Sequence, residues 1–339
     1  MASPAIRAYD RRALVVCREG VRRESVMRIV FFGSGEFAVP SLRSLTNSHH
    51  QIVAVVTPPD RPAGRGRKTI PTPVAARAIE DGLPLVPRAD VNEPAFVELV
   101  RDHAADLGVV IDFGQKLQAP IRTAFKCGCI NVHGSLLPKY RGAAPVARAI
   151  LDGEPWTGVT VFRLVDRMDA GPVLVQRQTR VGSEETCSDL EVRLSRIGCD
   201  AIQAALQMLE ADPWCPGEPQ DESKATRAPK LTKADGHLRF DEPAEQIARR
   251  CRAMWPWPGA RCRYVSTNGK SEEVILGMAT TVAATPEGPP GTLTPVLTVA
   301  CGQGALELHS IQPAGKRLMS WRDFVNGRHV EPGDRLETI

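Results

Sequence analysis

Long hydrophobic runs are missing from this 339-residue chain, and none approaches the roughly 20 residues that a membrane-spanning helix needs, so no membrane partner is expected. Internal repeats and low-complexity tracts are missing too. A large excess of one charge sign is also absent: the net charge is +4, which does not by itself imply nucleic-acid binding, although local basic clusters still allow it. The composition, 42% hydrophobic and 24% charged, is typical of a soluble globular protein.

A regular cysteine framework is missing as well. The nine cysteines are odd in number and scattered. Cys127 and Cys129 form the one close pair, which is tighter than zinc-ribbon spacing and has no complementary Cys or His pair. We therefore expect reduced thiols in a cytosolic protein, and no metal site.

The first 26 residues lack the apolar core of a secretory signal. They contain many arginines, but Asp10, Glu19 and Glu24 argue against a transit peptide. Met27 is followed at once by a buried-strand pattern. We expect residues 1–26 to be a disordered extension, or to reflect a start codon assigned too early.

The length predicts two domains, since single cores stop growing at about 250–300 residues. In residues 27–210, short apolar segments alternate with helical ones, which predicts a parallel sheet with helices on both faces. The expected strands are 28–32, 51–57, 107–112, 128–132, 158–164 and 172–180. The expected helices are 37–47, 72–81, 93–104, 142–151 and 186–210, the last beginning near Thr186.

Residues 211–234 are rich in proline and basic residues and show no periodic pattern, which is typical of a linker. Residues 235–336 carry a short helix near 243–254 and then alternating segments that predict a small β-barrel or sandwich. Those segments are 260–266, 272–279, 291–300 and 305–311.

The most informative run is INVHGSLLPKYRG, residues 130–142. Asn131 and His133 are two residues apart, so on an extended strand both side chains point the same way. Strand ends followed by irregular loops are where α/β proteins place their chemistry. An amide and an imidazole aimed at one point can donate hydrogen bonds to an oxygen that becomes negative during acyl transfer. The alternative is a capping Asn beside a structural His.

The turn Gly33-Ser34-Gly35 follows the first expected strand, as the phosphate-binding turn of a nicotinamide-dependent oxidoreductase does. However, no Asp or Glu ends the second strand, where Thr57-Pro58-Pro59 stands instead. A NAD site needs that acid to bind the ribose. We therefore interpret the glycines as a tight strand-to-helix turn.

The loop 57–73 is strongly basic: Arg61, Arg65, Arg67 and Lys68 stand against a single Asp60. Its prolines and glycines keep it from folding alone, and such a loop is suited to gripping phosphates and ordering on binding. A solvated surface loop is the alternative.

Asp169 precedes a Gly-Pro turn in the run MDAGP. A carboxylate there can orient an imidazole and keep it protonated, or it can simply stabilise the turn. Spacing does not show which, because the answer depends on its distance from His133 in space.

These motifs resemble those of the methionyl-tRNA formyltransferase family. The resemblance rests on TPPDRPAGRGRK, NVHGSLLPKYRGAAP, TGVTVF and MDAGPVL, and then on MWPWPGA at 254–260, IQPAGKRLM at 311–319 and PGDRL at 332–336. It covers residues 27–336. The core motif is shared among folate-dependent formyltransferases, whereas the basic loop and the IQPAGK segment narrow the match to the tRNA enzymes.

The resemblance implies a Rossmann-like formyltransferase domain followed by an OB-like β-barrel domain that binds tRNA. It implies transfer of a formyl group from 10-formyltetrahydrofolate to the amino group of initiator methionyl-tRNA, in translation initiation and without a metal. By motif position, the implied catalytic residues are Asn131, His133 and Asp169. The implied folate-binding residues are Ser135, Leu136, Leu137 and Pro138. The implied phosphate contacts to tRNA are Arg61, Arg65, Arg67, Lys68, Lys316 and Arg317, extended by the linker residues Lys224, Arg227, Lys230 and Lys233.

One segment departs from the family pattern. Within 109–121 the family usually has a small residue and Tyr before the Gly, whereas Asp112 and Phe113 stand here, and Lys116 and Gln118 replace apolar residues. If this loop lines the pterin pocket, Asp112 adds a charge there.

Other functions fit the same residues less well. A formyltransferase acting on an aminosugar nucleotide or a purine precursor has no need of the basic loop. A tRNA-binding protein that has lost catalysis would not need the intact catalytic trio. We expect a monomer in a bacterial cytoplasm, with an organellar location as the alternative.

Overall fold

The computed structural model describes residues 26–63, 68–283 and 288–339. The expectation of a disordered N-terminal extension therefore lies, apart from Val26, outside the described residues. In the described part of the chain, no helix combines the length and the apolar character that crossing a membrane requires.

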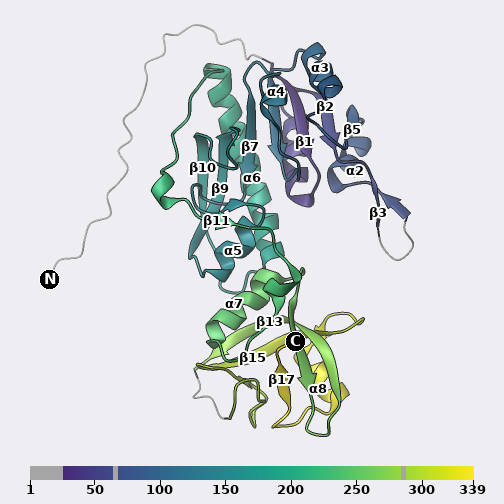
Figure 1. Ribbon diagram of the computed structural model, residues 1–339, viewed down its shortest axis with the longest axis vertical. Coiled ribbons are helices and arrows are strands. Elements are labelled where there is room, and N and C mark those ends of the chain that lie inside the picture. Colours follow the sequence, from purple (N-terminus) through teal and green to yellow (C-terminus); the bar gives the residue numbers. More distant parts are fainter. Residues whose placement is uncertain (1–25, 64–67, 284–287) are drawn as a thin grey trace, which may run out of the picture.

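The first half of the chain is built on a seven-stranded sheet with the spatial order β10-β9-β7-β6-β1-β2-β5 (Figure 1). Its strands are β1 (Arg28–Gly33), β2 (Gln51–Thr57), β5 (Leu85–Pro87), β6 (Leu107–Ile111), β7 (Cys129–His133), β9 (Trp156–Arg163) and β10 (Val173–Arg180). The pairings from β5 through to β7 are parallel, as expected. The expected parallel sheet is confirmed except at one edge, where β9 runs antiparallel to both β7 and β10. The short connection between β9 and β10 accounts for their antiparallel pairing, since parallel neighbours need a long crossover.

Continuous apolar runs in the central strands let the sheet bury both faces. In β1, Ile29 and Phe31 face one core, and Val30 and Phe32 face the other. The first core is covered by α1 (Val39–Thr46), α2 (Pro73–Glu80), α5 (Pro145–Leu151) and α6 (Cys187–Ala211). The second is covered by α3 (Pro94–Asp102) and the short α4 (Ala119–Arg122).

Helix α6 begins where its sequence signal predicted. Thr186 is its N-cap: the Asp189 backbone N–H donates to the Thr186 hydroxyl, and the Thr186 N–H donates to the Asp189 carboxylate. This reciprocal pair satisfies two backbone donors that the helix cannot use itself.

The second half forms an antiparallel sheet in the order β14-β15-β13-β12-β17, with β16 beside β15. Its elements are β12 (Ala260–Val265), β13 (Ser271–Val282), β14 (Val299–Ala300), β15 (Ala305–Pro313), β16 (Met319–Ser320), β17 (Arg335–Glu337), α7 (Ala244–Met254) and α8 (Trp321–Arg328). Gly291 nearly closes it into a barrel, because its N–H donates to Ala300 and its carbonyl accepts from Leu336. Within the expected segment 291–300, only Val299–Ala300 is a strand, while Thr292 and Leu293 form isolated bridges.

Helix α7 connects the two halves (Figure 1). Ile247 and Cys251 belong to the core of the barrel, whereas Ala253 and Met254 pack into the core of the first sheet. An ion pair between Arg148 of α5 and Asp235, 2.7 Å apart, adds a polar contact at the same junction.

Two expected irregular segments contain structure. The basic loop forms a short hairpin of β3 (Arg61–Ala63) and β4 (Lys68–Ile70) that projects from the first sheet (Figure 1). In the linker, η2 (Glu222–Lys224) is a 3-10 turn, and β11 (Arg227–Ala228) pairs in parallel with β8 (Arg141–Gly142). The linker is thus hydrogen-bonded to the segment that follows Asn131 and His133.

Candidate active site

Strand β7 carries Asn131 and His133 to the edge where its parallel neighbours end. In the register with β9, Asn131 lies opposite Phe162 and His133 opposite Thr160. The side chain of His133 is buried, whereas Asn131 is half-buried. Among the described residues, the amide of Asn131 makes no side-chain hydrogen bond, so its donors are available to a ligand.

His133 is oriented by a backbone carbonyl. Its Nε2 lies 2.9 Å from the carbonyl oxygen of Tyr140, which can only accept a hydrogen bond, so Nε2 carries a proton. The other ring nitrogen, Nδ1, faces Asp169 Oδ2 at 3.9 Å. That distance permits an ion pair but is too long for a hydrogen bond. The Tyr140 carbonyl, and not Asp169, therefore fixes the tautomer of His133.

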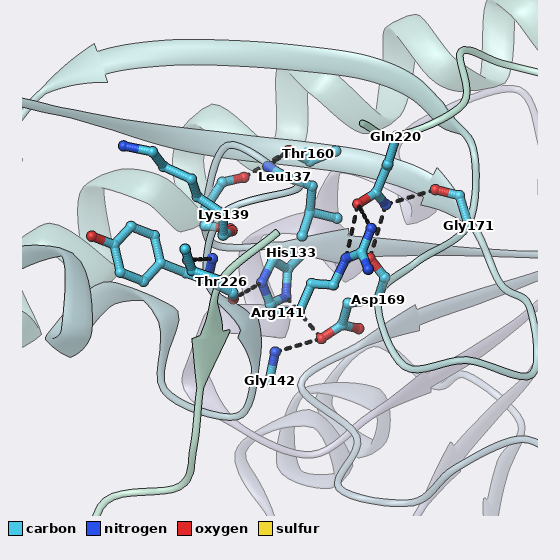
Figure 2. Close-up of polar contacts among 12 residues, drawn as sticks. His133, Leu137, Lys139, Arg141, Gly142, Thr160, Asp169, Gly171, Gln220 and Thr226 are labelled. Carbon is cyan, nitrogen blue, oxygen red and sulfur yellow. Dashed lines mark hydrogen bonds and ion pairs between the residues drawn. The ribbon is translucent and has the colours of Figure 1, made fainter. Parts of the chain in front are cut away.

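Asp169 lies in the connection between β9 and β10, with a left-handed backbone (φ 51°). Its Oδ2 accepts the backbone N–H of Gly142 at 2.8 Å. The structure thus brings together two side chains 36 positions apart in the sequence, His133 and Asp169, and resolves what spacing left open (Figure 2).

The segment from Ser135 to Pro138, which we name the rim, lies beside this pair and is held in place by hydrogen bonds. The hydroxyl of Ser135 is fully buried and donates to the carbonyl of Lys139 at 2.7 Å. The hydroxyl of Thr160 donates to the Ser135 carbonyl at 2.6 Å, and Gln176 donates to the Leu137 carbonyl at 2.7 Å. These bonds tie the rim to β9 and β10.

The residues of the rim therefore have two different roles. Ser135 and Leu137 are buried and hold its shape. Leu136 and Pro138 are half-buried and are the members whose surfaces remain open to a ligand.

The glycine turn after β1 is the tight strand-to-helix turn that the sequence indicated. The backbone N–H and the hydroxyl of Ser34 both donate to the carbonyl of Asp112, at 3.0 and 2.6 Å. A Cβ on Gly35 would lie 1.8 Å from Asp112 Oδ2, so the missing side chain at Gly35 makes room for that carboxyl group. Asp112 is exposed as a residue, but its carboxyl group lies against the turn, and the loss of hydration there raises its pKa.

The other substituted residues of that loop do not share this position. Phe113 is buried and packs edge-on against Phe32, with ring centroids 5.5 Å apart. Lys116 and Gln118 are exposed. Asp112 is therefore the substitution that lies against the glycine turn.

The expected basic residues are distributed over both halves. Lys316 and Arg317 are exposed between β15 and β16, and the four linker cations are exposed as well. Lys224 forms an ion pair with Asp221, 3.0 Å apart. Arg65 and Arg67 lie outside the described residues, and for Arg61 and Lys68 the structure describes the backbone alone.

Sequence reasoning missed the part of the linker that borders the site, residues 218–228, which we name the strap. The hydroxyl of Thr226 accepts the N–H of Tyr140 at 2.8 Å, and its carbonyl accepts the N–H of Arg141 at 2.9 Å. The side chain of Gln220 contacts both Arg141 and the Asp169 turn. No periodic pattern marks these residues within the basic, proline-rich linker, so the sequence carried no signal for them.

Metal ligands are few in the described part of the chain. The eight cysteines described there are free thiols. His49, His50 and Glu210 cluster within 4.8 Å, but at the opposite edge of the sheet, where β1 and β2 begin. The Met27 N–H donates to His50 Nδ1, which leaves the His50 proton on Nε2, the atom that a metal would need free.

Comparison with known proteins identifies the family. Residues 27–206 match the family model described as formyl transferase, and residues 230–329 match the model described as formyl transferase, C-terminal domain. A methionyl-tRNA formyltransferase from Methylococcus capsulatus is 44% identical over 315 residues, covering 92% of this chain and 100% of the relative. The chain belongs to the methionyl-tRNA formyltransferase family. A member from Halorhodospira halophila is 42% identical, covering 91% of this chain and 99% of its own length.

Solved structures outside this family share the fold. HypX from Aquifex aeolicus, determined with tetrahydrofolic acid, has a TM-score of 0.60 at 17% identity and covers 91% of this chain and 49% of its own. An N-formyltransferase from Helicobacter canadensis, determined with folinic acid and dTDP-3-aminofucose, has a TM-score of 0.61 at 17% identity and covers 86% and 100%. At 17% identity, these likenesses show that the fold is shared.

Proposed function

We propose that this protein transfers a formyl group from 10-formyltetrahydrofolate to the amino group of initiator methionyl-tRNA. The observation that carries the proposal is the approach of Asp169 to His133, 3.9 Å apart, at the end of the strand that also carries Asn131. It occurs in a chain that is 44% identical to a methionyl-tRNA formyltransferase along that relative's whole length.

Catalysis begins when the amine nitrogen attacks the formyl carbon. A C–N bond forms, and the formyl oxygen becomes negatively charged. The amide of Asn131 and a protonated Nδ1 of His133 donate hydrogen bonds to that oxygen, while the Tyr140 carbonyl keeps the Nε2 end of the ring in place. Donors of this kind are commonly worth about 3–4 kcal/mol each.

The intermediate then collapses. The bond between the formyl carbon and folate N10 breaks, and the formyl group stays on the amine. Asp169, 3.9 Å from His133 Nδ1, stabilises the charged imidazole and accepts the amine proton through a water. That proton ends on N10, so tetrahydrofolate leaves as a neutral amine.

The folate co-substrate would bind along the rim. Leu136 and Pro138 offer apolar surface to the pterin, while Ser135 and Leu137 hold the rim in shape. Asp112 lies at the same edge of the sheet, after β6. The fold neighbour solved with tetrahydrofolic acid supports a folate co-substrate.

The tRNA would be held by positive charge. The hairpin cations Arg61, Arg65, Arg67 and Lys68 would contact phosphates of the acceptor end. The exposed linker cations, with Lys316 and Arg317, would extend the contact to the barrel. Contacts of this kind position a nucleic acid and do not read its sequence.

The organisation follows from these roles. We propose a catalytic domain over residues 27–210, the linker over 211–234 and a tRNA-binding domain over 235–336. The protein would act as a monomer in a bacterial cytoplasm, gripping the tRNA between its two halves.

The decisive experiment offers 10-formyltetrahydrofolate with three acceptors: initiator methionyl-tRNA, an aminosugar nucleotide and an amino purine precursor. We expect formyl-methionyl-tRNA and no other formylated product. Formylation of a small acceptor alone, or of none at any enzyme concentration, would refute the proposal.

A further inference from the structure

The strap connects the two loops that carry the candidate catalytic residues. One loop, residues 134–142, follows His133; the other, residues 164–172, contains Asp169. Glu218 of the strap exchanges two backbone hydrogen bonds with Val173, both 2.8 Å, and β11 pairs with β8. Its side chains make the remaining contacts.

Two strap side chains contact both loops: Glu222, through ion pairs with Arg141 and Arg167, and Gln220, which binds Arg141 and the backbone of the Asp169 turn. The amide nitrogen of Gln220 donates to the carbonyls of Asp169 and Gly171, at 2.8 and 2.7 Å. Its amide oxygen accepts from Nε and Nη2 of Arg141, at 3.0 and 2.7 Å. Figure 2 shows the amide between the Arg141 guanidinium and Gly171. All four hydrogen bonds need a carboxamide, because one end must donate and the other must accept.

These bonds fix a strained turn. Asp169 has φ 51°, a conformation that costs a residue with a side chain about 1–2 kcal/mol, so neighbouring contacts must hold it there. Gln220 binds the carbonyl of Asp169 itself. On the other side, Arg141 precedes Gly142, whose N–H binds the Asp169 carboxylate. Gln220 thus fixes both ends of the contact that places Asp169.

We propose that Gln220 is a positioning residue for formyl transfer, which sets the place of the Asp169 carboxylate relative to His133 without touching the substrates. The inference rests on the proposed function for its kinetic readout. Displacement of a catalytic group by about 1 Å commonly costs about a hundredfold in rate. The effect is therefore large enough to measure.

Two substitutions separate the donor end from the acceptor end. Gln220→Met keeps the length and removes all four bonds, and Gln220→Glu keeps the acceptors for Arg141 but sets an oxygen against two carbonyls. We expect both to lower kcat by about ten- to a hundredfold and to leave both KM values within about twofold. A Gln220→Glu variant with wild-type kcat would overturn the proposal. Ser223→Ala is the matched control, since Ser223 bonds to Asp221 within the same strap.

Repeating Gln220→Met in an Asp169→Ala background distinguishes positioning from general destabilisation. If Gln220 acts through Asp169, its loss adds no further reduction, to within about twofold, in single-turnover rates. An equal reduction in both backgrounds would overturn the proposal.

One measurement needs no substrate. The ring signals of His133 in protein labelled with carbon-13 histidine, assigned with His133→Asn, should move in Gln220→Met and stay in place in Ser223→Ala. Unmoved His133 signals would overturn the positioning role. If the wild-type protein formylates no tRNA, the proposed function fails, while this measurement still decides the role of Gln220.

Discussion

The Asp169 carboxylate accepts the backbone N–H of Gly142 at 2.8 Å, so a backbone position in one loop sets a side chain of another. Gly142 has φ 131°, and a Cβ there would lie 2.4 Å from the carbonyl oxygen of Ala228 in β11. The same glycine therefore permits the strap to approach and presents the donor that Asp169 needs.

Gly142→Ala is expected to reduce both stability and activity. The added methyl group must displace β11 or the loop, at a cost of about 1–3 kcal/mol in the free energy of unfolding. Urea denaturation and single-turnover formylation measure the two effects. Gly82→Ala is the control, because Gly82 also has a left-handed backbone but open space around its Cα. It should lose stability and keep its kcat; a Gly142→Ala variant with normal kcat would contradict the role assigned to Gly142.

Asn131→Ala and His133→Ala should each lower kcat by about 10²- to 10³-fold, since each removes one donor to the developing oxyanion. Stopped-time assays with saturating substrates give the rates, and circular dichroism checks the fold. Because Asn131 has no side-chain partner among the described residues, its replacement should leave the midpoint of thermal unfolding nearly unchanged. Near-normal activity of either variant would remove that residue from the mechanism.

Replacing Arg65, Arg67 and Lys68 together with Gln should weaken tRNA binding in a salt-dependent way. Each lost phosphate contact lowers the slope of log K against log salt by about 0.7–0.9 in magnitude. Filter binding between about 50 and 200 mM salt measures the slope. The control replaces three exposed cations elsewhere, Arg43, Arg101 and Lys270, and should retain the wild-type slope. An unchanged slope in the first variant would mean that the hairpin is only solvated.

Stability should fall on acidification because of His50. Burial, and then the neighbouring His49, lower the pKa of His50, while Glu210 opposes them. His50 in the unfolded chain, with its ordinary pKa of 6.5, therefore binds a proton more readily than His50 in the folded protein. The free energy of unfolding is then higher above pH 6.5 and decreases as the pH falls below it. Denaturation at pH 7.5 and about 5.5 gives the change in the free energy of unfolding between the two pH values. Compared with the wild type, this change should be smaller in His50→Gln and larger in Glu210→Gln. Equal differences in all three proteins would exclude His50 as the cause.

The sequence predicts those parts of the fold whose apolar residues follow a regular pattern. Strands β1, β2, β6 and β7 were expected because each is a continuous apolar run bounded by turn residues. Helix α6 was expected from the N-cap at Thr186, which the structure confirms. Short strands were missed: β5 has three residues, directly follows Pro84 and ends in Pro87, and β17 also has three. Helix α8 was missed as well.

The candidate site was predictable only where one strand carries two residues. Asn131 and His133 share a strand, so their common direction follows from the period of two. The proximity of Asp169 depends on β9 running antiparallel to β7, a tertiary choice that spacing does not show. The role of Gln220 was not predictable for the same reason, since its four hydrogen bonds go to residues 49 to 79 positions away in the sequence.

The strap also sets where this protein can be recombined with a relative. A chimaera that takes everything after residue 211 from a relative would also take the relative's strap. Its catalytic loops would then contact a strap that evolved beside the catalytic loops of another protein. A crossover placed after Ala228 keeps both loops with their own strap. For this chain, the part needed for catalysis includes the strap and so extends beyond the sheet and the helices that cover it.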